Sequence, residues 1–175
     1  TRSIAVTGVQ TCALPILAAL TGAQVGALTA SQVAALGTAQ VAAISTDIAS
    51  LSTDALKGLT TAQLVALTTA QAAALTNDQM AALSTVQVGV LATDDLQALS
   101  GAQLAALTTA QAAALKANQV AALTTTQLAA LENADVGSLS TAAVKALTTA
   151  QLQALSGSQV GALTSTQVGA LTTDG

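Results

Sequence analysis

Few residues of this chain are of the types that carry out acid–base, nucleophilic or metal chemistry. The 175 residues include eight acids, four bases, one cysteine and no histidine. The acids stand closest together at Asp94-Asp95 and at Glu132 and Asp135. Paired carboxylates could bind a cation or exchange protons, but without a histidine no nucleophile–base pair can form beside them. We therefore predict that these acids are solvated at helix N-termini. The sequence predicts no catalytic, cofactor-binding or metal-binding residues and no enzyme activity.

The amino-acid composition limits the classes of partner that this chain can bind. The net charge is −4, and phenylalanine, tryptophan and tyrosine are all absent. A nucleic-acid surface needs clustered lysine and arginine, often with aromatic side chains that stack on bases, so we expect no nucleic-acid partner. Threonine or serine recurs every few residues, so no apolar run approaches the roughly 18 residues of a membrane span. We expect no membrane insertion and no cofactor.

An eight-residue repeat organises nearly all of the chain. Leucine or isoleucine recurs at every eighth residue from Leu20 to Leu171, and the one shorter unit runs from Ile44 to Ser50. The commonest unit is L-T-T-A-Q-V-A-A, whose residues we number as positions one to eight. We assign residues 17–175 to this array and expect it to be a fragment of a longer protein. Self-similarity at a short fixed period is typical of solenoid proteins.

The residues tolerated at each position predict which side chains are buried. Position one is always leucine or isoleucine, position six is apolar, and position eight is nearly always alanine. Position seven accepts Lys57 and Gln97, whereas positions three and four accept threonine, glycine, asparagine and aspartate. We therefore predict that positions one, six and eight are buried and that positions three, four and seven are exposed.

Each repeat has the pattern of one short helix. A continuous helix would rotate its leucine stripe by about 80° per unit, so it would form no single apolar face. Positions two and five instead form the capping box S/T-x-x-Q, as in Thr60 to Gln63 and Thr108 to Gln111. Position six and the next position one are three residues apart and share a face. The sequence predicts an all-α solenoid of one- to two-turn helices. The alternatives are a β-solenoid, which the even period would suit, and a disordered chain.

Two columns of polar side chains in the repeat could each have either a structural or a ligand-binding role. The glutamines at position five could form a stripe that faces a ligand, but we predict that they cap helices and form hydrogen bonds between them. The threonines at positions two and three could form a regular array that binds ice or glycan. The choice depends on whether the helix caps occupy these hydroxyl groups.

Residues 1–16 do not follow the repeat. From Val6 to Ile16 their sequence, VTGVQTCALPI, resembles the in-frame translation of a short-read sequencing adapter. This resemblance implies that residues 1–16 are an artefact of DNA sequencing, together with Arg2, Cys12 and Pro15. We expect their deletion to leave the stability of the array unchanged.

The repeat also resembles known families. The L-T-T-A-Q-V-A-A array is similar to octapeptide tracts of large bacterial surface or secreted proteins, often labelled adhesion or haem-utilisation proteins. Met80 stands alone as a ligand for haem iron, so the array offers no haem site. Residues 37–45 are similar to the first helix of TAL-effector repeats, but the longer unit and base-reading loop of that family are missing.

These observations lead to two hypotheses of function. The first is a non-enzymatic spacer or stalk of a bacterial cell-surface or secreted protein, which holds neighbouring domains of the same chain away from the cell. The second is a binding or adhesion module that presents its threonine columns to a glycan, a protein or ice. The resemblance to surface proteins implies an extracellular or cell-surface location.

Overall fold

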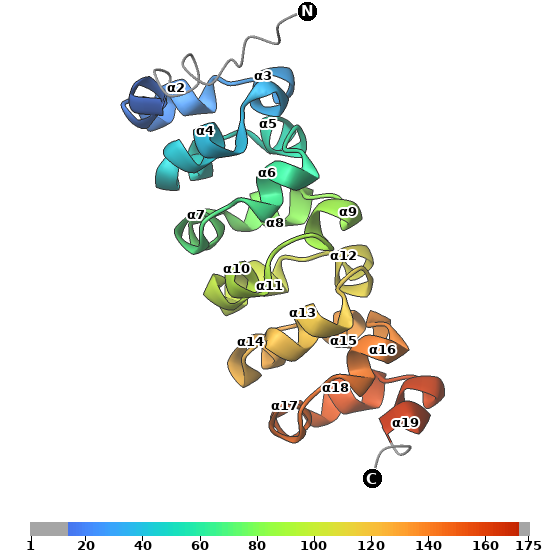
Figure 1. The fold of residues 1–175 in the computed structure, drawn as a ribbon. Helices are drawn as coiled ribbons and strands as arrows, with labels where there is room; N and C mark the ends of the chain where they lie inside the picture. Colours follow the sequence, from blue (N-terminus) through green and yellow to red (C-terminus); the bar gives the residue numbers. More distant parts are fainter. Residues whose placement is uncertain (1–13, 172–175) are drawn as a thin grey trace, which may run out of the picture.

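The computed structural model describes residues 14–171, which form a stack of short helices without a strand (Figure 1). The predicted all-α solenoid with one short helix per repeat is therefore confirmed, and the β-solenoid alternative is wrong. The prediction that residues 1–16 derive from an adapter falls largely outside the described residues and stays a prediction.

The helices follow one another with only short links. Residues 14–18 are helical, and the first third of the array then contains α2 (Gly22–Gly26), α3 (Ala30–Ala35), α4 (Thr38–Ala43), the 3-10 helix η1 (Ser45–Ser50), α5 (Thr53–Lys57) and α6 (Thr61–Val65). The middle third contains α7 (Thr69–Ala74), α8 (Asn77–Ala82), α9 (Thr85–Val88), α10 (Thr93–Ala98), α11 (Gly101–Ala105) and α12 (Thr109–Ala113). The last third contains α13 (Ala117–Ala122), α14 (Thr125–Ala129), α15 (Asn133–Ser138), α16 (Thr141–Lys145), α17 (Thr149–Ala154), α18 (Gly157–Ala162) and α19 (Ser165–Leu171).

The link between α8 and α9 shows one way in which a helix ends and the next begins. Leu83 ends α8 with extended backbone (φ −60°, ψ 143°), and its amide donates to the carbonyl oxygen of Met80. Ser84 is also extended (φ −72°, ψ 160°), and its hydroxyl accepts a hydrogen bond from the amide of Gln87. Two extended residues thus separate the helices. The leucine fills the core and the serine caps the next helix, which satisfies donors that a free helix end would leave unpaired.

The seven-residue unit keeps its place in the stack by a change of helix type. Aligned with the other units, it lacks the residue of position five, and it forms the 3-10 helix η1 in place of an α-helix. A 3-10 helix rises about 2.0 Å per residue against about 1.5 Å, so fewer residues span the same length. Ser45 takes a left-handed conformation (φ 54°) at its start, and Ile48 remains completely buried. The deletion therefore leaves the hydrophobic core continuous.

The helices wind into a superhelix with between three and four repeats per turn. Helices three units apart along the chain pack together, as α7 does with α10 and α12 with α15. Glutamines reach one unit further, to carbonyl groups 28 to 31 residues earlier. In Figure 1 the helices α7, α10, α14 and α17 follow one another along one side of the molecule. Each interior repeat therefore contacts the turn before it and the turn after it.

The buried positions differ from the prediction at one place. Positions one and six are buried as predicted, for example at Leu107 and Leu104, and positions three and four are mostly exposed. Position eight is only partly buried, and the third buried column is position five, the glutamines. The prediction for position eight was wrong because alanine lies there at the edge of the contact between turns, whereas the glutamine points into that contact. Small residues still permit close approach at position eight, since a Cβ atom on Gly58 would collide with the backbone of Ala30.

Candidate functional site

The most regular polar arrangement of the array is the glutamine column, and Gln111 shows its geometry. The Oε1 atom of Gln111 accepts a hydrogen bond of 2.6 Å from the amide of Thr108, which begins α12. Its Nε2 atom donates to the carbonyl oxygens of Met80 (2.8 Å) and Leu83 (2.6 Å) at the end of α8. One side chain therefore satisfies the first turn of its own helix and the last turn of a helix in the preceding superhelical turn.

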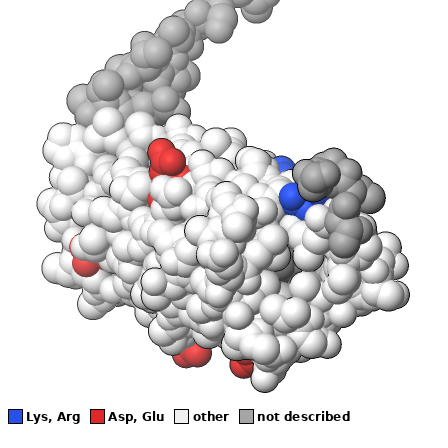
Figure 2. Space-filling model, turned by 90° about the horizontal axis from the view of Figure 1, so that it is seen from below, with Lys and Arg blue, Asp and Glu red and all other residues white. Residues whose placement is uncertain are grey.

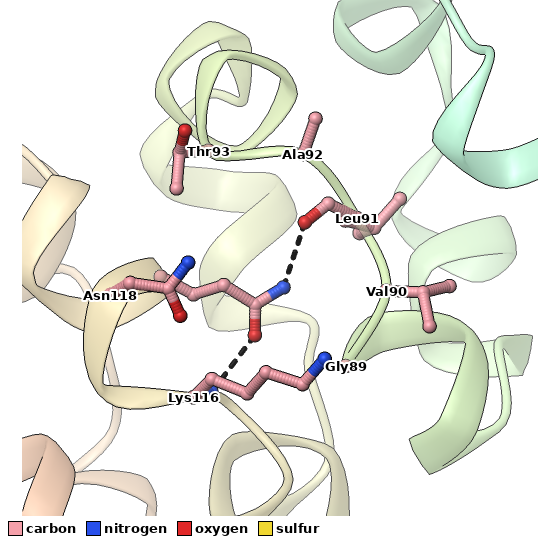
Figure 3. A pocket seen from close by; sticks show the side chains of 8 residues that line it. Gly89, Val90, Leu91, Ala92, Thr93, Lys116 and Asn118 are labelled. Carbon is pink, nitrogen blue, oxygen red and sulfur yellow. Dashed lines mark hydrogen bonds between the residues drawn. The ribbon is translucent and has the colours of Figure 1, made fainter.

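The same bridge recurs along the array. Gln119 accepts a hydrogen bond from the amide of Lys116 (2.8 Å) and donates one to the carbonyl oxygen of Leu91 (2.9 Å). The dashed lines in Figure 3 mark these two bonds, which end at the labelled Lys116 and Leu91. Bridges of this kind between turns are made by Gln63, Gln71, Gln79, Gln87, Gln103, Gln111, Gln119, Gln127, Gln151, Gln159 and Gln167. The predicted role in capping and inter-helix hydrogen bonding is therefore confirmed. The amides hold turns together and do not face a ligand.

Glutamine burial depends on the preceding turn. Gln24 and Gln32, in the first described turn, are exposed, whereas Gln63 and Gln71 are 2% and 0% exposed. Gln24 and Gln32 still accept the amide hydrogen bond that begins their own helices. Capping is thus a local property of the sequence, and burial is a property of the stack.

The hydroxyl groups at position two are occupied by helix capping. Thr60 accepts a hydrogen bond from the amide of Gln63 and donates one to Gln63 Oε1, and most units repeat the first of these bonds. At position three, Thr61, Thr69 and Thr125 are exposed, and their hydroxyl groups make no hydrogen bond to the described residues. Of the two threonine columns, position three is the one whose hydroxyl groups take no part in helix capping.

The prediction of solvated acids is wrong for two of the four residues it named. Asp94 and Glu132 are exposed, but Asp95 and Asp135 are 3% and 1% exposed, and their Oδ2 atoms have no hydrogen-bond partner. Both occupy position five, where the fold turns the side chain toward the preceding turn. Aligning the repeats would have shown that they replace the bridging glutamine. Aspartate is one methylene shorter than glutamine and, when ionised, has no proton to donate to a carbonyl group.

Burial changes the titration of these two acids. Burial raises the pKa of Asp95, and the negative charge of Asp94 raises it further. Burial also raises the pKa of Asp135, against a hydrogen bond from Thr109 that lowers it. The charge of Glu132 raises the pKa of Asp135, whereas the Glu132 backbone lowers it by a hydrogen bond. Both pKa shifts arise because an acid occupies the position at which most repeats bury a glutamine amide.

A shallow pocket lies where α13 begins beside the link between α9 and α10 (Figure 3). Its wall consists of Gly89, Val90, Leu91, Ala92, Thr93, Lys116, Asn118 and Gln119. Small residues at 89 and 92 leave the space open, and Lys116 is the one ionisable residue in the wall. Without a second ionisable side chain, this wall cannot pair an acid with a base.

The remaining candidates do not assemble into a site. In residues 14–171, no three of the side chains of histidine, cysteine, aspartate and glutamate gather closely enough to hold a metal ion. Met80 is completely buried in the core, and Cys12 lies outside the described residues. Within the same range, every helix is too short or too polar to cross a membrane.

Comparison with known proteins places the repeat in a family. No curated protein and no solved structure matches this chain. The family model of the ALTTAQ repeat, by contrast, matches residues 17–46, 45–85, 88–125, 128–165 and 145–173. Together these matches cover almost all of residues 17–173, nearly the whole of the octapeptide array at residues 17–175. The repetitive fold and the family are consistent with a structural, non-enzymatic protein. The chain belongs to the ALTTAQ repeat family.

Proposed function

We propose that this chain is a spacer, a non-enzymatic stalk segment of a bacterial cell-surface or secreted protein. One observation carries the proposal: the buried polar column of the array serves to join successive turns. Gln127, for example, donates to the carbonyl oxygens of Leu96, Gln97 and Leu99 at 2.9, 3.0 and 2.7 Å. In other proteins such buried polar groups could form a ligand site, whereas in this array they hold successive turns together.

The mode of packing also suits a spacer. Each repeat contacts its neighbours in the stack, so added repeats lengthen the molecule without changing its width. The interior is made of leucine, valine, alanine and glutamine with few charges, and the Lys57–Asp54 ion pair (3.2 Å) is largely exposed. Such a segment can vary in length while each turn keeps the same contacts.

Rigidity is the property that tests this proposal. Thr61→Cys and Thr149→Cys place spin labels at two exposed positions that lie far apart along the array. A Cys12→Ser background removes the chain's one cysteine. A spacer should give one narrow distance distribution by pulsed electron paramagnetic resonance. A broad distribution would contradict the proposal, because it would mean that the turns do not hold a fixed separation.

The surface location needs its own experiment. An antibody raised against residues 17–175 should label intact cells of the source bacterium. Labelling that appears only after the cells are permeabilised would contradict the location. The rigidity of the array and its location are thus tested separately.

A binding or adhesion module is the second candidate, and the exposed position-three hydroxyl groups favour it. The triple substitution Thr61→Val, Thr69→Val and Thr125→Val removes part of this column without touching the caps. Thr126→Val removes an exposed hydroxyl at position four and serves as the control. Binding to a glycan array, or inhibition of ice recrystallisation, should be lost in the triple variant alone if this candidate is correct. The spacer proposal expects no such binding in any variant.

A further inference from the structure

Asp95 and Asp135 are buried acids in the interior of the array to which the spacer proposal gives no role. They are 3% and 1% exposed, and the Oδ2 atom of each has no hydrogen-bond partner among the described residues. Packing does not require an acid at position five, because Ala143 is completely buried at this position of another repeat. In proteins a buried carboxylate is normally paired with donors or coordinated to a metal ion.

The register of the superhelix places backbone carbonyl groups opposite Asp95. A bridging glutamine donates to carbonyl oxygens 28 and 31 residues earlier, as Gln103 does in the next repeat. The same offsets from Asp95 lead to Leu67 and Leu64 at the end of α6. Among the described residues, these two carbonyl oxygens receive no bond from a side-chain amide. The buried carboxylate therefore faces oxygen acceptors without a donor between them.

Asp135 lies in the same arrangement one and a half superhelical turns further on. The offsets of 28 and 31 residues lead from Asp135 to Leu107 and Leu104 at the end of α11. The hydroxyl group of Thr109, two residues after Leu107, forms a hydrogen bond with the Asp135 side chain. This bond places the carboxyl group beside the segment that the register predicts.

A second acid stands close to each buried one. Asp94 precedes Asp95, and Glu132 is the N-cap of the helix that contains Asp135. The negative charges of these neighbours raise the pKa of the buried carboxyl groups, in addition to the effect of burial. On the face of the molecule in Figure 2, carboxylates are scattered over a largely uncharged surface, so little other negative charge on this face competes for a cation.

We propose that Asp95 and Asp135 each bind a calcium ion between the buried carboxylate and the carbonyl oxygens of the preceding turn. Carboxylate and backbone carbonyl oxygens are the ligands that Ca²⁺ prefers, and one site can combine both kinds. The donor set therefore needs no cluster of acidic side chains. The ion would join two turns of the superhelix, as a glutamine amide does in other repeats, whether or not the chain is a spacer.

The length of the aspartate side chain suits such an ion. In neighbouring repeats the Nε2 atoms of Gln87 and Gln103 lie 3.0 and 2.7 Å from the carbonyl oxygens of Leu59 and Leu75. An aspartate is shorter by one carbon–carbon bond, so its oxygen would stop roughly 4 Å from the matching carbonyl oxygens. Two calcium–oxygen bonds of about 2.3–2.6 Å that meet at an angle span this gap.

Isothermal titration calorimetry of the full chain with calcium chloride, in chelator-treated buffer near neutral pH, tests the proposal. The parent should bind two calcium ions per chain. Asp95→Asn and Asp135→Asn should each lose one site, and the double variant should lose both. Asp78→Asn is the matched control and should keep both sites, because it changes an exposed acid at position four of a repeat whose position five is a glutamine. Magnesium chloride should bind at least tenfold more weakly, because Mg²⁺ demands octahedral geometry and gives up its waters reluctantly.

The double variant Asp95→Gln with Asp135→Gln separates loss of the sites from loss of structure. Glutamine restores the amide bridge, so this variant should keep the parent's helical content in circular dichroism and bind no calcium. Calcium chloride should raise the thermal unfolding midpoint of the parent and of Asp78→Asn, and leave that of the glutamine variant unchanged. A parent that binds no calcium, or a double asparagine variant that binds it as well as the parent, would overturn the proposal.

Discussion

Gln111 and Leu83 lie 28 residues apart in the sequence, yet the Nε2 atom of Gln111 donates to the Leu83 carbonyl oxygen at 2.6 Å. The same side chain begins its own helix through Thr108. A residue type that suits a helix N-terminus by its local chemistry therefore also sets the contact between superhelical turns.

Removing a bridging glutamine should cost more than removing a capping glutamine. Gln111→Ala removes the glutamine half of the capping box of α12 and the amide that donates to the buried carbonyl groups of Met80 and Leu83, which we expect to cost about 2–4 kcal/mol. Gln32→Ala removes only the glutamine half of a capping box and should cost about 1 kcal/mol or less. Urea unfolding followed by circular dichroism measures both free energies. Equal losses would mean that the bonds between turns contribute nothing.

Two glycines at position seven should respond in opposite directions to alanine. A Cβ atom on Gly137 would lie 2.6 Å from the carbonyl oxygen of Ala162, whereas one on Gly161 would meet no atom within 4 Å. Gly137→Ala should destabilise the array by about 1–3 kcal/mol because backbone must move. Gly161→Ala should stabilise α18 by about 0.5–1 kcal/mol because alanine favours helix. Thermal unfolding would rank the two variants on either side of the parent, and a stabilised Gly137→Ala would disprove the close approach.

Truncating a leucine of position one should cost far more than truncating an exposed valine. Leu107 is 4% exposed and lies between turns, so Leu107→Ala should leave a cavity that costs about 2–5 kcal/mol. Val65→Ala, at a side chain that is 57% exposed, should change the free energy of unfolding by less than about 0.5 kcal/mol. Hydrogen exchange of the neighbouring amides should report the difference locally. Negligible effects in both variants would mean that the core is not packed.

Stability should decrease with rising pH because of Asp95 and Asp135. Their pKa values are raised above the ordinary 3.8, so the folded state binds their protons more tightly than the unfolded state. Their contribution is therefore most favourable below pH 3.8 and is lost as the pH rises through the raised values. Asp95→Asn with Asp135→Asn should flatten this part of the unfolding profile. Asp78→Asn, which changes an exposed acid, should retain this pH dependence. If the double variant Asp95→Asn with Asp135→Asn kept the slope of the parent, the two buried acids would not be the source of the pH dependence.

Asp135→Gln provides a related gain-of-stability test at neutral pH. The register of the column predicts that the new amide would reach the carbonyl groups of Leu104 and Leu107. It would also remove a buried carboxyl oxygen that has no hydrogen-bond partner. We expect the free energy of unfolding to rise by about 1–3 kcal/mol in denaturant titrations. A loss of stability would show that this position does not follow the register of Gln127 and Gln151.

The sequence by itself determined the helices. Threonine and glutamine three residues apart cap a helix through groups of the same segment, so the pattern from Thr108 to Gln111 predicts α12 without reference to the rest of the chain. The core columns at positions one and six followed from the same period, because residues three apart share a helix face. The absence of histidine likewise excludes a histidine-based nucleophile–base pair without reference to the fold.

Only the tertiary structure decided where the helix N-terminal polar residues point. Locally, Gln32 and Gln63 are the same residue in the same capping box, yet the first is exposed and the second is buried beneath the carbonyl groups of Val33 and Leu36. The sequence predicts a solvated Asp95, and this prediction is wrong for the same reason. The residues that bury Asp95 belong to another turn of the superhelix. The number of repeats per turn depends on packing between residues about 30 apart, and nothing within one octapeptide specifies that distance.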